Sequence, residues 1–370
     1  MKYIKELEGL RGLMALWVVA GHAFASLPLL SGKLPANLMN TQAVDVFIML
    51  SGFVIFFMLD NKKQSYGTYI TQRFFRIFPI YLFALILSMV MLSFTLDVLT
   101  LAPQSPATPS RIDFINQFYA HPILHTVFHF ILMQGVIPGF LLEGSSFTIL
   151  GQAWSVSVEW QFYLIAPLLF ILMNEIHKRK YFLILMVFVI ACLVFGKVTD
   201  KGFYGNNLLA FSIGYITFYF YKHMFPVISK NQLRVVVAVF LLLSFIILKK
   251  DCVPVFIWVI SFYSVLKKEK EGDTNIVSKI LDAKPILFIG RVSYSIYMVH
   301  MAVVFCFLKL FAGKETISLY WYFAFPALCI IASIVISGIT YRLIEAPMIS
   351  FGKKVTARFA RSNRGPEVIS

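Results

Sequence analysis

The first apolar segment of the chain carries two ionisable side chains, and they constrain the fold more than any other feature. Arg11 and His22 are separated by a spacing close to three turns of an α-helix. Both side chains therefore lie on one face of that helix, with His22 about 16 Å further along its axis. Ionisable groups are costly inside a membrane and are usually functional there. We therefore expect the chemistry of this protein along that helix face.

The composition indicates a membrane protein. Of the 370 residues, 59% are hydrophobic and only 14% are charged, whereas soluble domains carry about 25% charged residues. Apolar runs that suit membrane-spanning helices recur along the chain. These runs are Leu10–Pro28, Val44–Leu59, Pro79–Leu99, Trp160–Met173, Phe182–Gly196, Leu208–Tyr221, Val235–Leu248, Val253–Leu266, Pro285–Phe311 and Leu319–Leu343. We predict an all-α polytopic membrane protein of about ten transmembrane helices in one bundle, with both termini in the cytoplasm.

The distribution of basic residues supports this topology. With a cytoplasmic N-terminus, most of the 33 Lys and Arg residues fall on the cytoplasmic side, as the positive-inside rule requires. The outer side keeps Lys33, Arg111, Lys197, Lys201, Lys249, Lys250, Lys309 and Lys314. The net charge of +15 is thus explained by topology and by attraction to anionic lipid of the bilayer. We expect no nucleic-acid partner.

Two segments are not expected to be simple membrane spans. Residues Thr100–Gly151 read as a long, Pro-rich outer loop. Within it, the apolar stretch Leu124–Val136 is too short to span and suits a re-entrant or interfacial piece. Residues 350–370 are basic and polar, so we expect a cytoplasmic tail that follows a transmembrane domain of residues 1–349.

Two arginines precede the third predicted span. Arg73 and Arg76 are three residues apart, which makes them neighbours on a helical turn at the cytoplasmic entry to the span that starts at Pro79. Each guanidinium can hold phosphate oxygens in a bidentate way, so the pair suits a diphosphate. Taken alone, the pair is better explained as an ordinary positive-inside anchor.

A carboxylate lies among tryptophans at the predicted outer end of another span. Trp154 and Trp160 are typical of the aromatic belt at a membrane interface. Glu159, which stands beside Trp160 and before an unbroken apolar run, is harder to explain in that way. It could orient a protonated histidine or bind a sugar hydroxyl, and the indoles could stack on pyranose rings.

Most candidate residues, taken one at a time, also have an ordinary structural explanation. Arg11 alone could be a snorkelling anchor, and His22 alone could be a buried histidine bonded to a neighbouring helix. A lone membrane histidine such as His300 is more often structural than catalytic. Asp45 stands at the outer end of the second span. The histidines at positions 121, 125 and 129 could line one helical face, but they lack an evident fourth ligand, so we expect no metal site.

Six motifs, taken in order along the chain, resemble the acyltransferase-3 family of integral membrane O-acyltransferases. They are Arg11-x10-His22, Ser51-Gly52-Phe53, Arg73-x-x-Arg76-x-x-Pro79, Trp154-Ser155-x-Ser157-x-Glu159, Ser293-Tyr294-Ser295-x-Tyr297-x-x-His300 and Ile344-Glu345-x-Pro347. The resemblance implies ten helices. It also implies that acyl groups pass from a cytoplasmic acyl-CoA to hydroxyls of surface carbohydrates or lipid-linked glycans.

The resemblance also implies roles for individual residues. His22 takes a catalytic role, Arg11 and the pair Arg73 and Arg76 a role toward the acyl-CoA donor, and Glu159 an essential role on the outer side. Secondary candidates are Asp45, Ser51, Trp154, His300 and Glu345. Many relatives carry an extra helix and a soluble hydrolase-like domain that these 370 residues do not contain. The resemblance therefore does not imply an acceptor specificity that depends on such a domain.

We therefore predict a multi-pass O-acyltransferase of the bacterial cytoplasmic membrane that modifies a cell-envelope glycan. Its donor substrate would be an acyl-CoA, with acetyl-CoA as the first expectation, and no cofactor would be bound permanently. His22 would deprotonate the acceptor hydroxyl or carry the acyl group itself. The alternative is an ion-coupled small-molecule transporter, in which Asp45, Glu159, His22 and His300 would form a relay. A purely structural protein would leave the face shared by Arg11 and His22 unexplained.

Overall fold

The described chain is helical throughout, as the sequence predicts. The computed structural model describes residues 4–28, 41–272 and 275–362, and within these ranges it contains helices and turns but no β-strand. Six helical stretches of the described chain are long and apolar enough to cross a membrane. They are Thr41–Asn61, Tyr66–Val90, Gly151–Asn174, Lys230–Glu271, Lys284–Phe311 and Leu319–Phe359. The chain is therefore a multi-pass membrane protein by length and composition, while ten spans stay a prediction.

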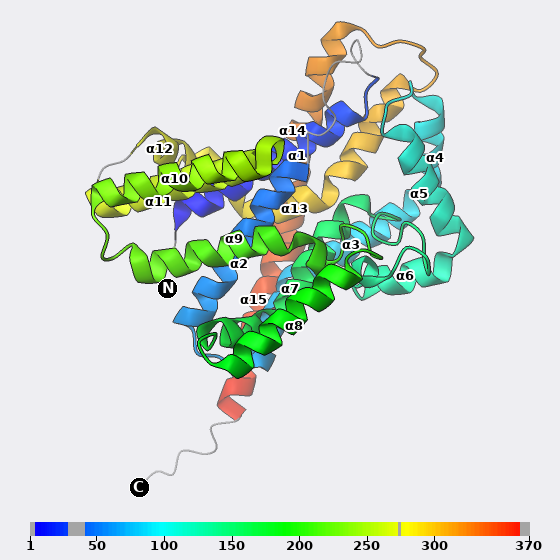
Figure 1. Cartoon of the computed structure of the whole chain (residues 1–370). Coiled ribbons are helices and arrows are strands. Elements are labelled where there is room, and N and C mark those ends of the chain that lie inside the picture. The colour runs from blue at the N-terminus through cyan, green and yellow to red at the C-terminus, as the bar shows by residue number, and fades with distance from the viewer. Residues whose placement is uncertain (1–3, 29–40, 273–274, 363–370) are drawn as a thin grey trace.

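The helices follow one another closely along the chain (Figure 1). The α-helices are α1 (Lys5–Ala25), α2 (Thr41–Asn61), α3 (Tyr66–Val90), α4 (Leu92–Leu101), α5 (Thr108–Ala120), α6 (Pro122–Phe130), α7 (Trp154–Asn174), α8 (Arg179–Phe195), α9 (Leu208–Tyr219), α10 (Lys230–Leu248), α11 (Val253–Glu271), α12 (Ile276–Leu281), α13 (Lys284–Leu308), α14 (Leu319–Thr340) and α15 (Ala346–Ser362). Short 3-10 or π turns are η2 (Gln134–Val136), η3 (Gly151–Ala153), η4 (Tyr204–Asn207), η5 (Phe220–Met224), η6 (Lys249–Cys252), η7 (Lys309–Phe311) and η8 (Tyr341–Glu345). Each of the ten predicted segments contains helix.

Helices α1 and α13 pack against each other at backbone distance. A Cβ atom on Gly12 would lie 2.7 Å from the backbone nitrogen of Gly290 and 2.9 Å from the carbonyl oxygen of Ile286. Glycine permits this approach because it has no Cβ atom, and small residues are typical of close helix contacts in membranes. The two helices therefore pack closely along their contact.

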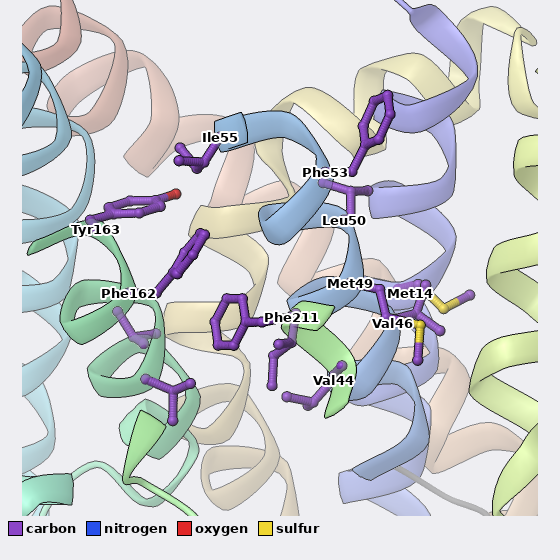
Figure 2. Close-up of a cluster of buried hydrophobic side chains, with 14 of the residues drawn as sticks. Met14, Val44, Val46, Met49, Leu50, Phe53, Ile55, Phe162, Tyr163 and Phe211 are labelled. Carbon is purple, nitrogen blue, oxygen red and sulfur yellow. The ribbon is translucent and has the colours of Figure 1, made fainter. Parts of the chain in front are cut away.

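Helix α2 lies beside α1 and is enclosed by apolar side chains (Figure 2). Phe53 is fully buried, and its ring lies 4.9 Å from the ring of Phe262. On another side of α2, the rings of Phe162 from α7 and Phe211 from α9 meet at 4.2 Å. Packing of this kind holds the polar residues of α2 in one orientation.

Helix α3 starts well before the predicted point. Its N-cap is Ser65, whose side chain accepts a hydrogen bond from the backbone nitrogen of Thr68 at 3.3 Å. Pro79, which the prediction took as the start, lies inside the helix, where membrane helices tolerate proline. The predicted start of the span at Pro79 was wrong. The prediction that Arg73 and Arg76 are neighbours on a helical turn is confirmed, since both lie within α3.

The segment Thr100–Gly151 forms short helices. It contains α5 and α6, both with proline in the first turn, where a missing backbone N–H costs little. Together with α4 they group on one side of the bundle (Figure 1). The segment after α6 returns to that helix, since His125 Nδ1 and His129 Nε2 each lie 3.0 Å from the hydroxyl of Thr148. Neither α5 nor α6 is long enough to span a membrane, so the segment is not a simple span, as predicted. Its position on the outer side stays a prediction.

The basic C-terminal segment begins as a helix. Helix α15 continues from α14 through the π turn η8 and packs against α3. Gln72 donates a hydrogen bond from Nε2 to Thr356 Oγ1 at 3.1 Å. Residue 350 thus lies inside α15, and residues 363–370 of the predicted tail lie outside the described residues. The division into residues 1–349 and 350–370 stays a prediction.

Candidate active site

Three cavities border the candidate residues. The carboxylate cavity, of about 260 Å³, is lined by Glu8 and Glu345, among others. The arginine cavity, of about 70 Å³, is lined by Ser51, Glu159 and Tyr297 with apolar neighbours. The histidine cavity, of about 230 Å³, is lined by His22, Arg111, Gln152, Trp154 and a larger number of apolar side chains. Helix α1 contributes residues to all three.

Two arginines join the first two cavities. Arg11 from α1 and Arg76 from α3 line both the carboxylate and the arginine cavity. Arg76 interacts electrostatically with Glu345, which lines the carboxylate cavity, and with Glu159, which lines the arginine cavity. The fold therefore brings together two basic residues that the sequence analysis assigned to the same donor from separate motifs.

Arg73 occupies a different environment from Arg76. Its Nη2 lies 3.7 Å from the sulfur of Met58, and its Cζ lies 5.7 Å from the centre of the Tyr163 ring. Arg73 does not line any of the three cavities described above. Three residues along a helix leave side chains about 60° apart around the axis, which separates the surroundings of the two guanidinium groups.

Glu159 lies beside the arginines rather than beside His22. Its carboxylate accepts a hydrogen bond from Ser51 Oγ at 3.0 Å and a second from the hydroxyl of Tyr163. Helix α7 begins at Trp154, which lines the histidine cavity, and Glu159 follows about 7.5 Å further along the helix axis. This distance moves Glu159 from the predicted outer end into the arginine cavity.

A hydrogen-bonded layer lies between the arginine and histidine cavities. Tyr297, which lines the arginine cavity, donates to the carbonyl oxygen of Gln152 at 3.0 Å, and its hydroxyl lies 2.7 Å from Ser155 Oγ. Gln152, which lines the histidine cavity, donates from Nε2 to the carbonyl oxygen of Met298 at 3.0 Å. The start of α7 is thereby fixed against α13.

The two candidate histidines are in ring contact. The ring centres of His22 on α1 and His300 on α13 are 5.1 Å apart. His300 is completely buried, and its Nδ1 donates to the carbonyl oxygen of Tyr297 at 2.8 Å. Its Nε2 has no hydrogen-bond partner among the described residues. The imidazole of His22 is thus in contact with a second imidazole that is itself hydrogen-bonded to the backbone.

Sequence reasoning missed Arg111 as a site residue and counted it only as an outer charge. It comes from α5 and lines the histidine cavity with His22. Its Nη1 donates to Ser26 Oγ at 2.7 Å, and Ser26 Oγ donates to the carbonyl oxygen of His22 at 2.7 Å. The sequence did contain a signal that Arg111 lies on a packed helix. It is a basic residue beside Ile112 and Ile115, two apolar positions at helical spacing.

The other secondary candidates are divided between the cavities and the periphery. Glu345 is buried in η8, lines the carboxylate cavity and accepts a hydrogen bond from Ser295 Oγ at 2.6 Å. Asp45 lies near the start of α2 and does not line any of the three cavities. Its carboxylate interacts electrostatically with Lys201 and Asp251.

Comparison with known proteins identifies the family. A family model described as an acyltransferase domain matches residues 4–342. The chain belongs to the acyltransferase-3 family. It is 23% identical over 403 aligned residues to the O-acetyltransferase OatA of Staphylococcus aureus strain NCTC 8325 / PS 47, and this alignment covers 96% of the chain and 59% of OatA. It is 27% identical over 189 residues to the acyltransferase MdmB of Streptomyces mycarofaciens, covering 48% of the chain and 42% of MdmB.

These matches confirm the resemblance seen in the six motifs. The chain spans 59% of the length of OatA, so the relative contains sequence with no counterpart here. No solved structure matches the chain. The family therefore establishes the class of protein, and the arrangement of the cavities described above is the basis for assigning its chemistry.

Proposed function

We propose that this protein is a membrane O-acyltransferase. It transfers an acyl group, with acetyl as the simplest case, from cytoplasmic acyl-CoA to a hydroxyl of a cell-envelope carbohydrate or lipid-linked glycan. The observation that carries this proposal is the placement of Arg11 and His22 on one helix, each lining a different cavity. Membership of an acyltransferase family, and similarity to OatA, which is an O-acetyltransferase, support acyl transfer over the transporter alternative.

The donor binds at the arginines in this proposal. Arg11 and Arg76 border both the carboxylate and the arginine cavity, and guanidinium groups bind phosphate oxygens through charge-assisted, bidentate hydrogen bonds. The positive-inside rule assigns the N-terminal end of α1 to the cytoplasm. The diphosphate of acyl-CoA is then held at the cytoplasmic end, and its thioester extends along α1 toward His22.

His22 activates the acceptor in this proposal. Its imidazole takes the proton of the acceptor hydroxyl, the hydroxyl oxygen bonds to the thioester carbonyl carbon, and the carbon–sulfur bond breaks. The imidazolium then returns its proton to the leaving thiolate of CoA. General base catalysis of this kind typically contributes about 10² to 10⁴ in rate. His300, in ring contact with His22, acts as a positioning residue. A covalent acyl-histidine is the other route that His22 chemistry allows.

The histidine cavity suits a carbohydrate acceptor. It is lined by the aromatic side chains of Phe114, Phe147 and Trp154, and the first two are stacked at 5.2 Å. Flat apolar surfaces can cover the C–H faces of a sugar ring while a few polar groups fix its orientation. In the proposed topology of ten spans, with both termini in the cytoplasm of a bacterium, this cavity lies on the outer side.

The test is release of free CoA by the purified protein in the presence of acetyl-CoA and a bacterial envelope glycan fraction. We expect acceptor-dependent release by the unaltered protein and none by His22→Ala. The matched control is His177→Ala, because the exposed side chain of His177 contacts Glu175 and lies outside the cavities described above. Coupled uptake of a small solute without any CoA release would favour the transporter instead.

A further inference from the structure

Arg111 is a cation that lines the histidine cavity, and no carboxylate among the described residues forms an ion pair with it. Within the described chain its polar contact is the hydrogen bond to Ser26, and its Cζ lies 5.7 Å from the ring centre of Phe305. Asp97 on α4 and Asp113 on α5 are exposed. The sequence of residues 29–40, which follows α1, contains neither Asp nor Glu.

Arg111 is half-buried, so its guanidinium loses hydration that its hydrogen bond to Ser26 replaces only in part. Burial lowers the pKa of the Arg111 guanidinium to about 10, and no carboxylate of the described residues raises it. Guanidinium groups carry five N–H donors, of which Ser26 engages one. Buried arginines are ordinarily paired with an acid. The missing negative charge can therefore come from the ligand.

The position of Arg111 relates it directly to the proposed catalytic residue. Ser26 accepts from Arg111 and donates to the carbonyl oxygen of His22, one helical turn earlier on α1. The cation of Arg111 and the imidazole of His22 line the same cavity. The stacked rings of Phe114 and Phe147 line it as well. An anion bound at Arg111 would thus hold a sugar ring at a fixed position relative to His22.

We infer that the histidine cavity recognises an acidic acceptor, whose carboxylate or phosphate binds Arg111 while a nearby hydroxyl faces His22. This inference rests on the proposed function and adds the substrate class to it. A uronic acid and a sugar phosphate offer the same oxyanion chemistry to the guanidinium. Arg111 then determines specificity for the acceptor, separately from the arginines that bind the donor.

The experiment compares three acceptors with the purified, unaltered protein. The probes are an oligosaccharide that contains glucuronic acid, the same oligosaccharide after reduction of its carboxyl groups to neutral glucose, and its counterpart with phosphate on the neutral sugar. We expect kcat/KM for at least one charged probe to exceed that for the neutral probe by about tenfold or more. The stronger of the two charged probes identifies the source of the anion.

Variants then test whether Arg111 causes this preference. Arg111→Gln removes the charge and should reduce the charged-to-neutral ratio of kcat/KM to near one. Arg111→Lys keeps the charge but loses the planar fork, so it should retain part of the ratio. The matched control is Lys197→Gln, an exposed cation predicted on the same side, which should keep the full ratio.

The outcomes separate the two proposals. If the unaltered protein acylates neutral and charged probes equally well, the acidic-acceptor inference is overturned while the acyltransferase proposal stands. A ratio that survives in Arg111→Gln also overturns it. If no acceptor causes CoA release, both proposals fall. The first comparison uses the unaltered chain, so it decides the matter even where a variant does not fold.

Discussion

Substitution of Gly12 by alanine tests whether the close contact of α1 and α13 supports the site. The new Cβ would lie 2.7 Å from the nitrogen of Gly290 and 2.9 Å from the carbonyl oxygen of Ile286, whereas ordinary contacts begin at 3.4 Å. Both obstacles are backbone atoms, so no side chain can rotate away. The helices must therefore separate locally by more than half an ångström.

The expected cost follows from two opposing terms. Alanine stabilises a helix interior by about 1 kcal/mol relative to glycine, whereas overpacking of a filled interior costs about 1–3 kcal/mol. Gly12→Ala should therefore be neutral to about 2 kcal/mol less stable. Gly338→Ala is the matched control, since its nearest neighbour would be the Phe288 Cζ at 3.8 Å, and it should gain stability.

Activity should respond more strongly than stability. Helix α1 carries Arg11 and His22, and α13 carries Tyr297 and His300, so their separation displaces both sides of the site. A misplacement of about 1 Å can cost about 10²-fold in rate, and we expect about a tenfold loss of CoA release here. Denaturant unfolding in detergent and the CoA assay measure the two effects. Equal stability and equal activity of Gly12→Ala and Gly338→Ala would refute the reasoning.

Three further predictions concern the donor site and the membrane topology. Arg76→Ala should raise the KM for acyl-CoA far more than the KM for the acceptor. Arg73→Ala should have a much smaller effect on the KM for acyl-CoA. A larger effect of Arg76→Ala on the KM for the acceptor would contradict the donor assignment. Glu159→Gln should weaken the two charge-assisted hydrogen bonds to Ser51 and Tyr163 and lower the free energy of unfolding by about 1–2 kcal/mol. It should also change the affinity for acyl-CoA in isothermal titration. An unchanged affinity would show that Glu159 takes no part in donor binding. Single cysteines at Lys201 and Lys279 test the topology, because an impermeant reagent should reach only the first in intact cells.

The helix periodicity of the sequence was enough to identify part of the site. The spacing of Arg11 and His22 places both on one face wherever the helix packs, because the argument uses only local geometry. Their separation into different cavities depends on α3, α7 and α13. The sequence could not show that Arg73 would pack against Tyr163 while Arg76 lines two cavities.

The residues that sequence reasoning misplaced or missed depend on tertiary contacts. Glu159 was assigned to the outer end because the apolar run starts at Trp160, but α7 begins at Trp154 and carries Glu159 inward. Arg111 comes from a segment whose prolines suggested a loop. Its approach to Ser26 joins residues 85 positions apart, and no local pattern predicts such a contact.

The central claim is that acyl groups pass along α1 between cavities on opposite sides of the membrane. The direct measurement uses sealed proteoliposomes with the acidic oligosaccharide enclosed and radiolabelled acetyl-CoA added only outside. Our account predicts labelled oligosaccharide inside the vesicles with the unaltered protein and none with His22→Ala. Labelling that occurs only when donor and acceptor are placed on the same side would contradict it.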